Sequence, residues 1–163
     1  MNGKSGYVGR AFPPQSFGPV TRTDFVRYAG ASGDFNPMHH DEPYAVKTGN
    51  PSVFSMGMFQ AGLLSTYATK LLGARNIRRF TVRFRERVWP GDTLTCSATV
   101  TAAAPAGDGA DGTDAGDGLK VSLDLECTNQ EGKTVVSGSA DFLVSADALD
   151  ALDALAAPAA VTP

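Results

Sequence analysis

The residues of this chain best suited to acid–base chemistry are Asp34 and His39, which lie five positions apart in a polar segment. A carboxyl group and an imidazole have ordinary pKa values of about 3.9 and about 6.5, so such a pair can exchange protons near neutral pH. Gly33 permits a tight backbone turn, and Pro37 stops a helix from continuing through the segment. The side-chain amide of Asn36 could hold a water molecule or a carbonyl group. The spacing therefore predicts an acid–base pair on a rigid loop.

A purely structural interpretation of the same segment stays open from local chemistry alone. An aspartate after a glycine is often a turn or cap residue, and Asn36-Pro37 is a common turn dipeptide. His39, His40 and Asp41 could simply cap the next segment. The residue types exclude neither interpretation.

Two helices are expected to position this segment. The first begins with Thr21 as N-cap and Asp24 in the first turn, and Gly33 ends it just before the candidate pair. The second covers residues 57–72 and is followed by a glycine. Other structure should surround this second helix, because most of its circumference is apolar: Met58, Phe59, Leu63, Leu64, Tyr67, Leu71 and Leu72.

Alternating apolar residues predict strands in the second half of the chain. Phe80, Val82 and Phe84 alternate with polar residues over 79–88, which predicts a strand with one buried face. The remaining expected elements are a short strand near residues 7–12, a short helix after Pro43, and strands over 93–103, 119–129 and 134–144. The order predicts a single α+β domain, in which a curved antiparallel sheet wraps around the helix of residues 57–72.

Two segments are expected to lie outside the core of this domain, which spans residues 1–145. Residues 104–118 contain four aspartates, five glycines and no large apolar side chain, which predicts a flexible connection between two strands. The aspartates recur every third residue, but this spacing matches no EF-hand loop, so no metal site is expected. The alanine-rich residues 146–163 are expected to form a poorly ordered tail.

The length of 163 residues suits one domain that buries a core of its own. No run approaches about 18 consecutive apolar residues, so no transmembrane helix is expected. The first residues lack the apolar stretch of a secretory signal, which favours a cytoplasmic location. Cys96 and Cys127 fit no metal-ligand spacing and are expected to be buried free thiols rather than a redox pair.

The charges that give the formal net charge of −3 are unevenly distributed, and one region of the chain is basic. Seven of the 17 acidic residues lie in residues 104–118 and 146–163, which leaves 10 acidic against 14 basic residues, or +4, elsewhere. Six arginines fall within 13 positions: Arg75, Arg78, Arg79, Arg83, Arg85 and Arg87. They could be a solvated strand face that discourages aggregation, or a basic surface for an acidic partner. Stacking aromatics do not interleave them, so nucleic acid is not an expected partner.

Ser32-Gly33-Asp34-Phe35-Asn36-Pro37-Met38-His39, preceded by Tyr28 and followed by Ala45, forms a longer motif. It resembles the motif of the MaoC-like, or (R)-specific enoyl hydratase (hydratase 2), family, and departs from it only in the unbranched Met38. Two further runs extend the resemblance over residues 17–145: Phe54-Ser55-Met56-Gly57-Met58 and Pro90-Gly91-Asp92-Thr93-Leu94. The resemblance implies a hotdog fold, in agreement with the architecture expected from the pattern.

The resemblance also implies roles for the residues of the motif. Asp34 and His39 would hold one water molecule on one face of a 2-enoyl thioester, activate it for attack at Cβ and deliver a proton to Cα. Dehydration of a (3R)-3-hydroxyacyl thioester is the reverse reaction. Asn36 would orient the water or the loop. No cofactor and no metal are implied.

The start of the helix of residues 57–72 is the expected oxyanion site. The reaction places negative charge on the thioester oxygen, and backbone N–H groups at a helix N-terminus can stabilise that charge. Gly57, with Ser55 beside it, is therefore the candidate for orienting the substrate, although the glycine could instead serve tight helix packing. Met56 stands where many relatives carry a histidine, which leaves substrate type and rate open.

The sequence thus predicts an (R)-specific 2-enoyl thioester hydratase or 3-hydroxyacyl thioester dehydratase that acts on acyl-CoA or acyl carrier protein substrates. Arg83, Arg85 and Arg87 are candidates for contacting the phosphates of either carrier. Two alternatives remain: a catalytically silent hotdog subunit that shapes the acyl tunnel of a heterodimeric dehydratase, and a hotdog thioesterase. A homodimer is expected, with a heterodimer of two hotdog subunits as the alternative, and neither nucleic acid nor a membrane is an expected partner.

Overall fold

The computed structural model describes residues 7–106, 118–145 and 147. The elements follow in the order β1 (Gln15–Phe17), α1 (Arg22–Ser32), the 3-10 turn η1 (Pro37–His39), α2 (Glu42–Lys47), α3 (Gly57–Leu72), β2 (Ile77–Phe84), β3 (Leu94–Pro105), β4 (Gly118–Thr128) and β5 (Thr134–Ser145). The strand expected near residues 7–12 is reduced to one bridge between Ala11 and Thr99. The strand β1 begins only after Pro13 and Pro14, which have no N–H to donate to a sheet.

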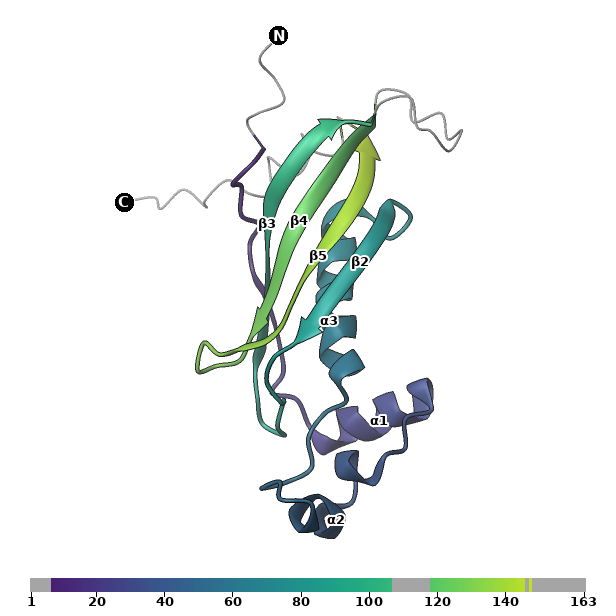
Figure 1. Ribbon diagram of the computed structural model, residues 1–163, viewed down its shortest axis with the longest axis vertical. Helices are drawn as coiled ribbons and strands as arrows, with labels where there is room; N and C mark the ends of the chain where they lie inside the picture. Colours follow the sequence, from purple (N-terminus) through teal and green to yellow (C-terminus); the bar gives the residue numbers. More distant parts are fainter. Residues whose placement is uncertain (1–6, 107–117, 146, 148–163) are drawn as a thin grey trace, which may run out of the picture.

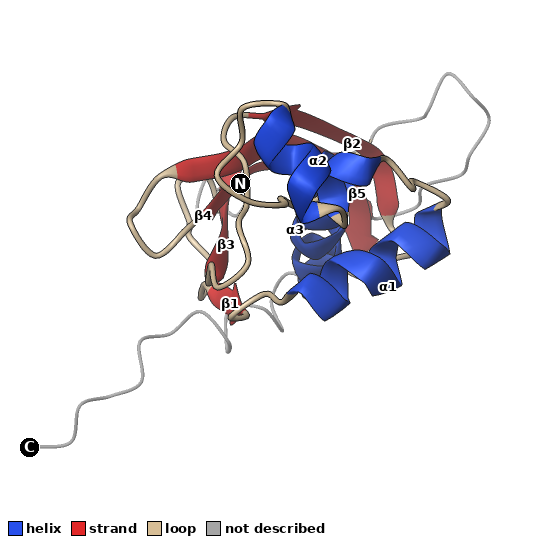
Figure 2. Ribbon diagram, turned by 90° about the horizontal axis from the view of Figure 1, so that it is seen from below, coloured by secondary structure: helices blue, strands red, loops and turns tan. Residues whose placement is uncertain are grey.

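The five strands form one antiparallel sheet in the order β1-β3-β4-β5-β2. The sheet curves around α3, as Figure 2 shows, and α1 and α2 lie beyond the N-terminal end of α3 (Figure 1). This arrangement confirms the expected α+β fold with a curved sheet and a central helix. It also gathers the loops that precede α3 at one end of the molecule.

The core lies between α3 and the concave face of the sheet. Ala61, Leu64, Ala68 and Leu72 recur at helical spacing along α3 and are almost completely buried. They face a sheet whose inward residues are also buried, including Leu123, Leu125 and Phe142. Within the described chain other structure covers only part of α3, because Met58 is 56% exposed and Phe59, Leu63 and Leu71 are only partly buried. The sheet covers one side of the helix only.

The strand expected over residues 79–88 is shorter and less buried than its pattern suggests. It runs over Ile77–Phe84, and Phe84 is 47% exposed. β2 pairs only with β5 among the described strands, so it is an edge strand. After Glu86, whose N–H still points to the Val135 carbonyl of β5, the Val88 carbonyl accepts a 2.9 Å hydrogen bond from the Ser55 N–H. This contact joins the end of β2 to the segment before α3.

The strands β3 and β4 extend into both ends of the connection expected over residues 104–118, because Ala104 pairs with Lys120 and Pro105 with Leu119. The four aspartates of that connection and the alanine-rich tail fall outside the described residues, apart from residue 147. Cys96 and Cys127 are buried free cysteines facing each other across β3 and β4, as expected. A hydrogen bond with Cys96, together with burial, raises the pKa of the Cys127 thiol. None of the helices in the described part is long and apolar enough to cross a membrane.

Candidate active site

The end of α1 places Asp34 at the start of the site. Thr21 caps the helix, and its side chain and that of Asp24 form a capping box, as the sequence predicts. Gly33 ends the helix with φ of +74°, a left-handed conformation that strains other residues, and donates its N–H to Ala29. The chain therefore turns sharply just before Asp34.

Short-range hydrogen bonds fix the loop that follows. The N–H of Asp34 donates to the Ser32 hydroxyl at 3.2 Å, and the Asp34 carboxylate accepts the N–H of Asn36 at 3.3 Å. The Asn36 side-chain oxygen accepts the N–H of Met38 at 3.1 Å and so caps η1. Of the two tasks expected for Asn36, these contacts favour holding the loop.

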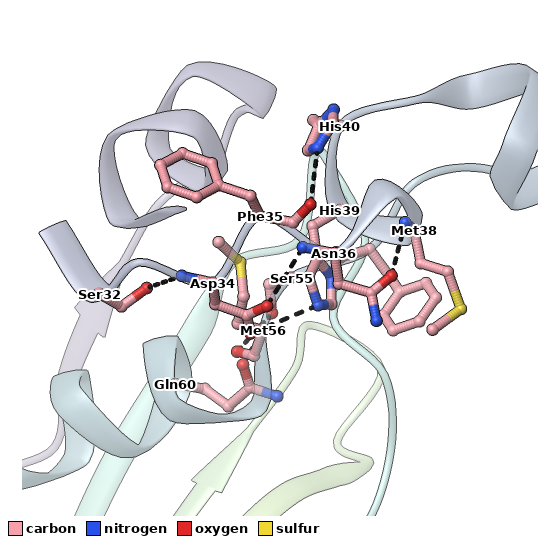
Figure 3. Close-up of polar contacts among 11 residues, drawn as sticks. Ser32, Asp34, Phe35, Asn36, Met38, His39, His40, Ser55, Met56 and Gln60 are labelled. Carbon is pink, nitrogen blue, oxygen red and sulfur yellow. Dashed lines mark hydrogen bonds and ion pairs between the residues drawn. The ribbon is translucent and has the colours of Figure 1, made fainter. Parts of the chain in front are cut away.

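His39 is the buried member of the candidate acid–base pair (Figure 3). Its Nδ1 lies 2.8 Å from the carbonyl oxygen of Phe54. A carbonyl oxygen only accepts, so Nδ1 carries a hydrogen and Nε2 of the neutral ring is left with a lone pair. That Nε2 lies 3.8 Å from Oδ2 of Asp34, which is too long for a direct hydrogen bond. The structure brings the two predicted residues together across a narrow gap.

Phe54 ties His39 to the rest of the molecule. Its ring meets the His39 ring edge-on at 5.2 Å between centroids and the Trp89 ring at 5.8 Å. The guanidinium of Arg87 lies over the same ring at 5.1 Å. The N–H of Phe54 also points to the Met38 carbonyl at 3.4 Å. The imidazole is thus oriented by both the backbone and the ring of one residue.

A cavity of about 430 Å³ opens at the N-terminal end of α3. Its lining consists of Phe54, Ser55, Gly57, Gln60, Phe84, Arg85, Glu86 and Arg87. Asp34 and His39 do not line this cavity themselves, and the pair is joined to it through the backbone of Phe54, which is followed directly by Ser55. The cavity therefore combines the start of a helix with two arginines.

Gly57 serves packing and also presents a donor. A Cβ at this position would lie 3.1 Å from the Phe84 ring, so the helix approaches that ring more closely than a larger residue allows. Met56 occupies the N-cap without a side-chain bond, and the N–H groups of Gly57 and Met58 have no acceptor among the described residues. Both interpretations of Gly57 made from the sequence are thus compatible with its surroundings.

Gln60 is a polar residue of this region that the motifs and spacings of the sequence do not single out. It is 2% exposed, and its Oε1 accepts a hydrogen bond of 2.7 Å from the hydroxyl of Ser55, which is 3% exposed. The signal was present in the sequence, because Gln60 stands one residue before the buried Ala61 in an otherwise apolar turn of α3. An amide at such a position predicts either a buried partner or a polar ligand.

The structure separates the three candidate arginines. Arg87 lines the cavity at α3, whereas Arg83 lines a shallow hollow of about 410 Å³ together with Asp124 and Ser137, and Arg85 borders both. Within the described part of the chain, none of the three lies within 4.0 Å of a carboxylate. All six arginines between Arg75 and Arg87 are exposed. Arg83 therefore fits the solvated strand face better than a role at the cavity.

Comparison with known proteins decides the family. A family model described as the MaoC like domain matches residues 6–117, which span more than half of the chain. The chain belongs to the MaoC-like domain family.

This MaoC-like chain is similar to a curated protein and to several solved structures. The (R)-specific enoyl-CoA hydratase of Rhodospirillum rubrum is 32% identical over 129 residues, which cover 78% of this chain and 81% of the relative. The unliganded R-hydratase PhaJ1 of Pseudomonas aeruginosa superimposes with a TM-score of 0.70 at 26% identity, over 85% of this chain and 81% of that one. These similarities confirm the hotdog fold expected for a MaoC-like chain.

A further solved structure is an assembly of different subunits. A chain of the ChsH1–ChsH2 complex of Mycobacterium tuberculosis superimposes on this MaoC-like chain with a TM-score of 0.68 at 25% identity, over 85% of this chain and 97% of that one. Related chains of this fold therefore occur within complexes of two named components.

Proposed function

We propose that this MaoC-like chain is an (R)-specific 2-enoyl thioester hydratase, which also catalyses the reverse dehydration of (3R)-3-hydroxyacyl thioesters. The observation that carries the proposal is the pairing of His39 Nε2 with Asp34 Oδ2 at 3.8 Å, with Nδ1 held by the Phe54 carbonyl. The relatives named as R-hydratases support this choice of reaction. Asp34 and His39 are the acid–base pair.

The gap between the two side chains suits one water molecule that hydrogen-bonds to both. In hydration, Nε2 of His39 accepts one proton of this water while the water oxygen forms a bond to Cβ of the enoyl group. The electrons of the C=C bond move towards the thioester carbonyl and give an enolate. The imidazolium then returns its proton to Cα, so that the elements of water are added from one face. The Asp34 carboxylate accepts a hydrogen bond from the second O–H of the water, which stays on the product as its hydroxyl group, and stabilises the imidazolium.

The negative charge of the enolate is stabilised by the N-terminal end of α3. The N–H of Gly57 points from the first turn of a 16-residue helix, whose dipole places partial positive charge at this end. Removal of one such donor typically slows an enzyme by about 100- to 1,000-fold. Arg87, at the rim of the cavity, is placed to attract the phosphates of coenzyme A or of the carrier-protein prosthetic group.

Single substitutions of the pair test the reaction. Asp34→Asn keeps the oxygen that accepts the Asn36 N–H, and His39→Ala removes the base; each should lower kcat for crotonyl-CoA hydration by about 100-fold or more. Loss of the enoyl absorbance measures the rate. His40→Ala is the matched control, since the ring of this exposed histidine hydrogen-bonds only to the Phe35 carbonyl among the described residues. Full activity in both folded variants would refute the mechanism, and release of free thiol without hydration would indicate a thioesterase instead.

We further propose that two copies of the chain form a homodimer along the exposed side of α3. Three features support this: β2 has one edge that pairs with no other described strand, Met58 is 56% exposed, and Phe84 is 47% exposed beside the cavity. Light scattering after size-exclusion chromatography should give twice the chain mass of 17.0 kDa. A monomer that is inactive alone, and that gains activity with a second hotdog subunit, would favour the silent-subunit alternative.

A further inference from the structure

A buried pair of polar side chains lies next to the cavity and has no part in the mechanism given above. Ser55 and Gln60 are 3% and 2% exposed, and both line the cavity at α3. Figure 3 shows the Gln60 side chain reaching from α3 to the Ser55 hydroxyl. Buried polar side chains are normally retained only where all their strong donors and acceptors find partners.

The geometry of this pair leaves one donor free. The 2.7 Å distance between Ser55 Oγ and Gln60 Oε1 is typical of an O–H···O bond and shorter than the usual N–H···O distance. The serine hydroxyl therefore donates to the amide oxygen, and Nε2 forms the other end of the same amide. Among the described residues, Nε2 has no acceptor. A nearly completely buried amide thus presents two N–H bonds that no protein group accepts.

Both this amide and the start of α3 face the same cavity. Gln60 lies three residues after Gly57 on α3, and residues at this spacing share one side of a helix. The backbone N–H of Gly57 has no acceptor among the described residues either. Two kinds of donor, one from the backbone and one from a side chain, therefore border one space.

We propose that Gln60 Nε2 donates the second hydrogen bond to the carbonyl oxygen of the thioester substrate, with Gly57 N–H donating the first. Ser55 is a positioning residue that turns the amide so that nitrogen, rather than oxygen, faces the substrate. This assignment rests on the proposed function, because it needs a thioester in the cavity. The bond strengthens as the carbonyl oxygen becomes an enolate oxygen, so Gln60 acts mainly on kcat.

Gln60→Met tests the donor with little change in side-chain volume or helix propensity. We expect kcat for crotonyl-CoA to fall by about 100-fold while KM changes less than about threefold. The control is Gln130→Met, since Gln130 Nε2 donates to Asp92 at 2.8 Å in a turn outside the cavity lining. That variant should keep the wild-type kcat. A folded Gln60→Met enzyme with the wild-type kcat would overturn the proposal.

Ser55→Ala and Gln60→Glu separate positioning from packing. Ser55→Ala should lower kcat by about tenfold in the wild type and have no effect in the Gln60→Met background, because the two residues act through one amide. Gln60→Glu cannot donate when ionised but can when protonated. As the pH is lowered from about 8 to about 5, the kcat of Gln60→Glu relative to the wild type should therefore rise. A loss of packing alone would not produce this pH dependence.

A binding measurement tests the role of Gln60 as a hydrogen-bond donor independently of the proposed reaction. The probe is butyryl-CoA carrying carbon-13 at its carbonyl, a thioester that has no double bond to hydrate. Its bound carbonyl signal should move downfield in the wild type, and this movement should be smaller in Gln60→Met. If the wild type shows the movement but hydrates no enoyl thioester, the proposed function fails and the donor assignment stands. If both proteins give the same signal, or the wild type binds no butyryl-CoA, the assignment is wrong.

Discussion

The Nδ1 of His39 lies 2.8 Å from the carbonyl oxygen of Phe54, a residue 15 positions further along the chain. One hydrogen bond therefore joins the loop after α1 to the segment that begins α3. It sets the tautomer of the imidazole and points the lone pair of Nε2 towards Asp34. The proposed acid–base pair depends on this long-range contact as much as on its own two residues.

Replacing the ring of Phe54 should make the His39 side chain less well oriented, while the backbone carbonyl of residue 54 still accepts the hydrogen bond from Nδ1. Phe54→Leu removes edge-on contacts with the rings of His39 and Trp89, so we expect kcat to fall by about tenfold with little change in KM. Steady-state kinetics on crotonyl-CoA measure the effect. Phe35→Leu is the control, because the Phe35 side chain is 64% exposed, and equal losses in both variants would contradict the positioning role of Phe54.

A methyl group at Gly57 should be harmful, and one at Gly62 should not. The Cβ of Gly57→Ala would lie 3.1 Å from the Phe84 ring, so the ring or the start of α3 must shift by a few tenths of an ångström at the cavity lining. We expect kcat/KM to fall by at least about tenfold. Gly62→Ala, on the same helix, meets nothing within 4 Å and should raise the free energy of unfolding by about 0.5–1 kcal/mol. Enzyme assays and urea denaturation check both statements, and unchanged kinetics in Gly57→Ala would contradict the close approach.

Arg87 should matter for substrate binding more than the arginines of the outer strand face. Arg87→Ala should raise KM for a CoA thioester by about threefold and weaken its dependence on salt, since exposed charges attract phosphates less at high ionic strength. Arg79→Ala removes another exposed charge, from β2 outside the lining of the cavity. It should leave KM unchanged. The same rise in KM for both variants would show that overall charge, rather than the position of Arg87, attracts the substrate.

The cap of α1 should make the free energy of unfolding depend on pH in the acidic range. Hydrogen bonds from Thr21 hold the pKa of Asp24 below its ordinary value, so the ionised carboxylate is favoured in the folded chain. This contribution is fully present above the ordinary pKa of about 3.9 and is lost as the pH falls through the lower folded value. Thr21→Ala should cost about 1 kcal/mol at neutral pH.

Urea denaturation at several pH values tests this prediction. The difference between wild type and Thr21→Ala should shrink below the folded pKa of Asp24, because the protonated carboxyl no longer gains from the bond. Thr23→Ala, an exposed position in the same turn with no side-chain hydrogen bond among the described residues, is the control. A difference that stays constant with pH would show that the bond to Asp24 is not the cause.

Local sequence patterns predict the ends of the main helices well. Thr21, Gly33 and Gly73 each act through their own backbone or side chain, and the structure places helix ends at these residues. The pairing of Asp34 with His39 is also local, since both lie on one short loop. Short-range chemistry of this kind does not depend on the rest of the fold.

Long-range contacts were harder to predict. The exposure of Phe84 follows from the position of β2 at the edge of the sheet, which alternation alone does not indicate. The role of the Phe54 carbonyl cannot be predicted from the residue type, because every residue has a backbone carbonyl group. Gln60 was visible in the sequence, but its bond to Ser55 depends on how the segment before α3 bends back over the helix.

The two members of the proposed acid–base pair differ greatly in their contact with solvent. The Asp34 side chain is 47% exposed and that of His39 only 9%. In the proposed reaction each hydration consumes one water molecule, and the next can reach the pair from solvent at the half-exposed Asp34 carboxylate. Replacing the consumed water would then not depend on opening the buried His39 side of the pair.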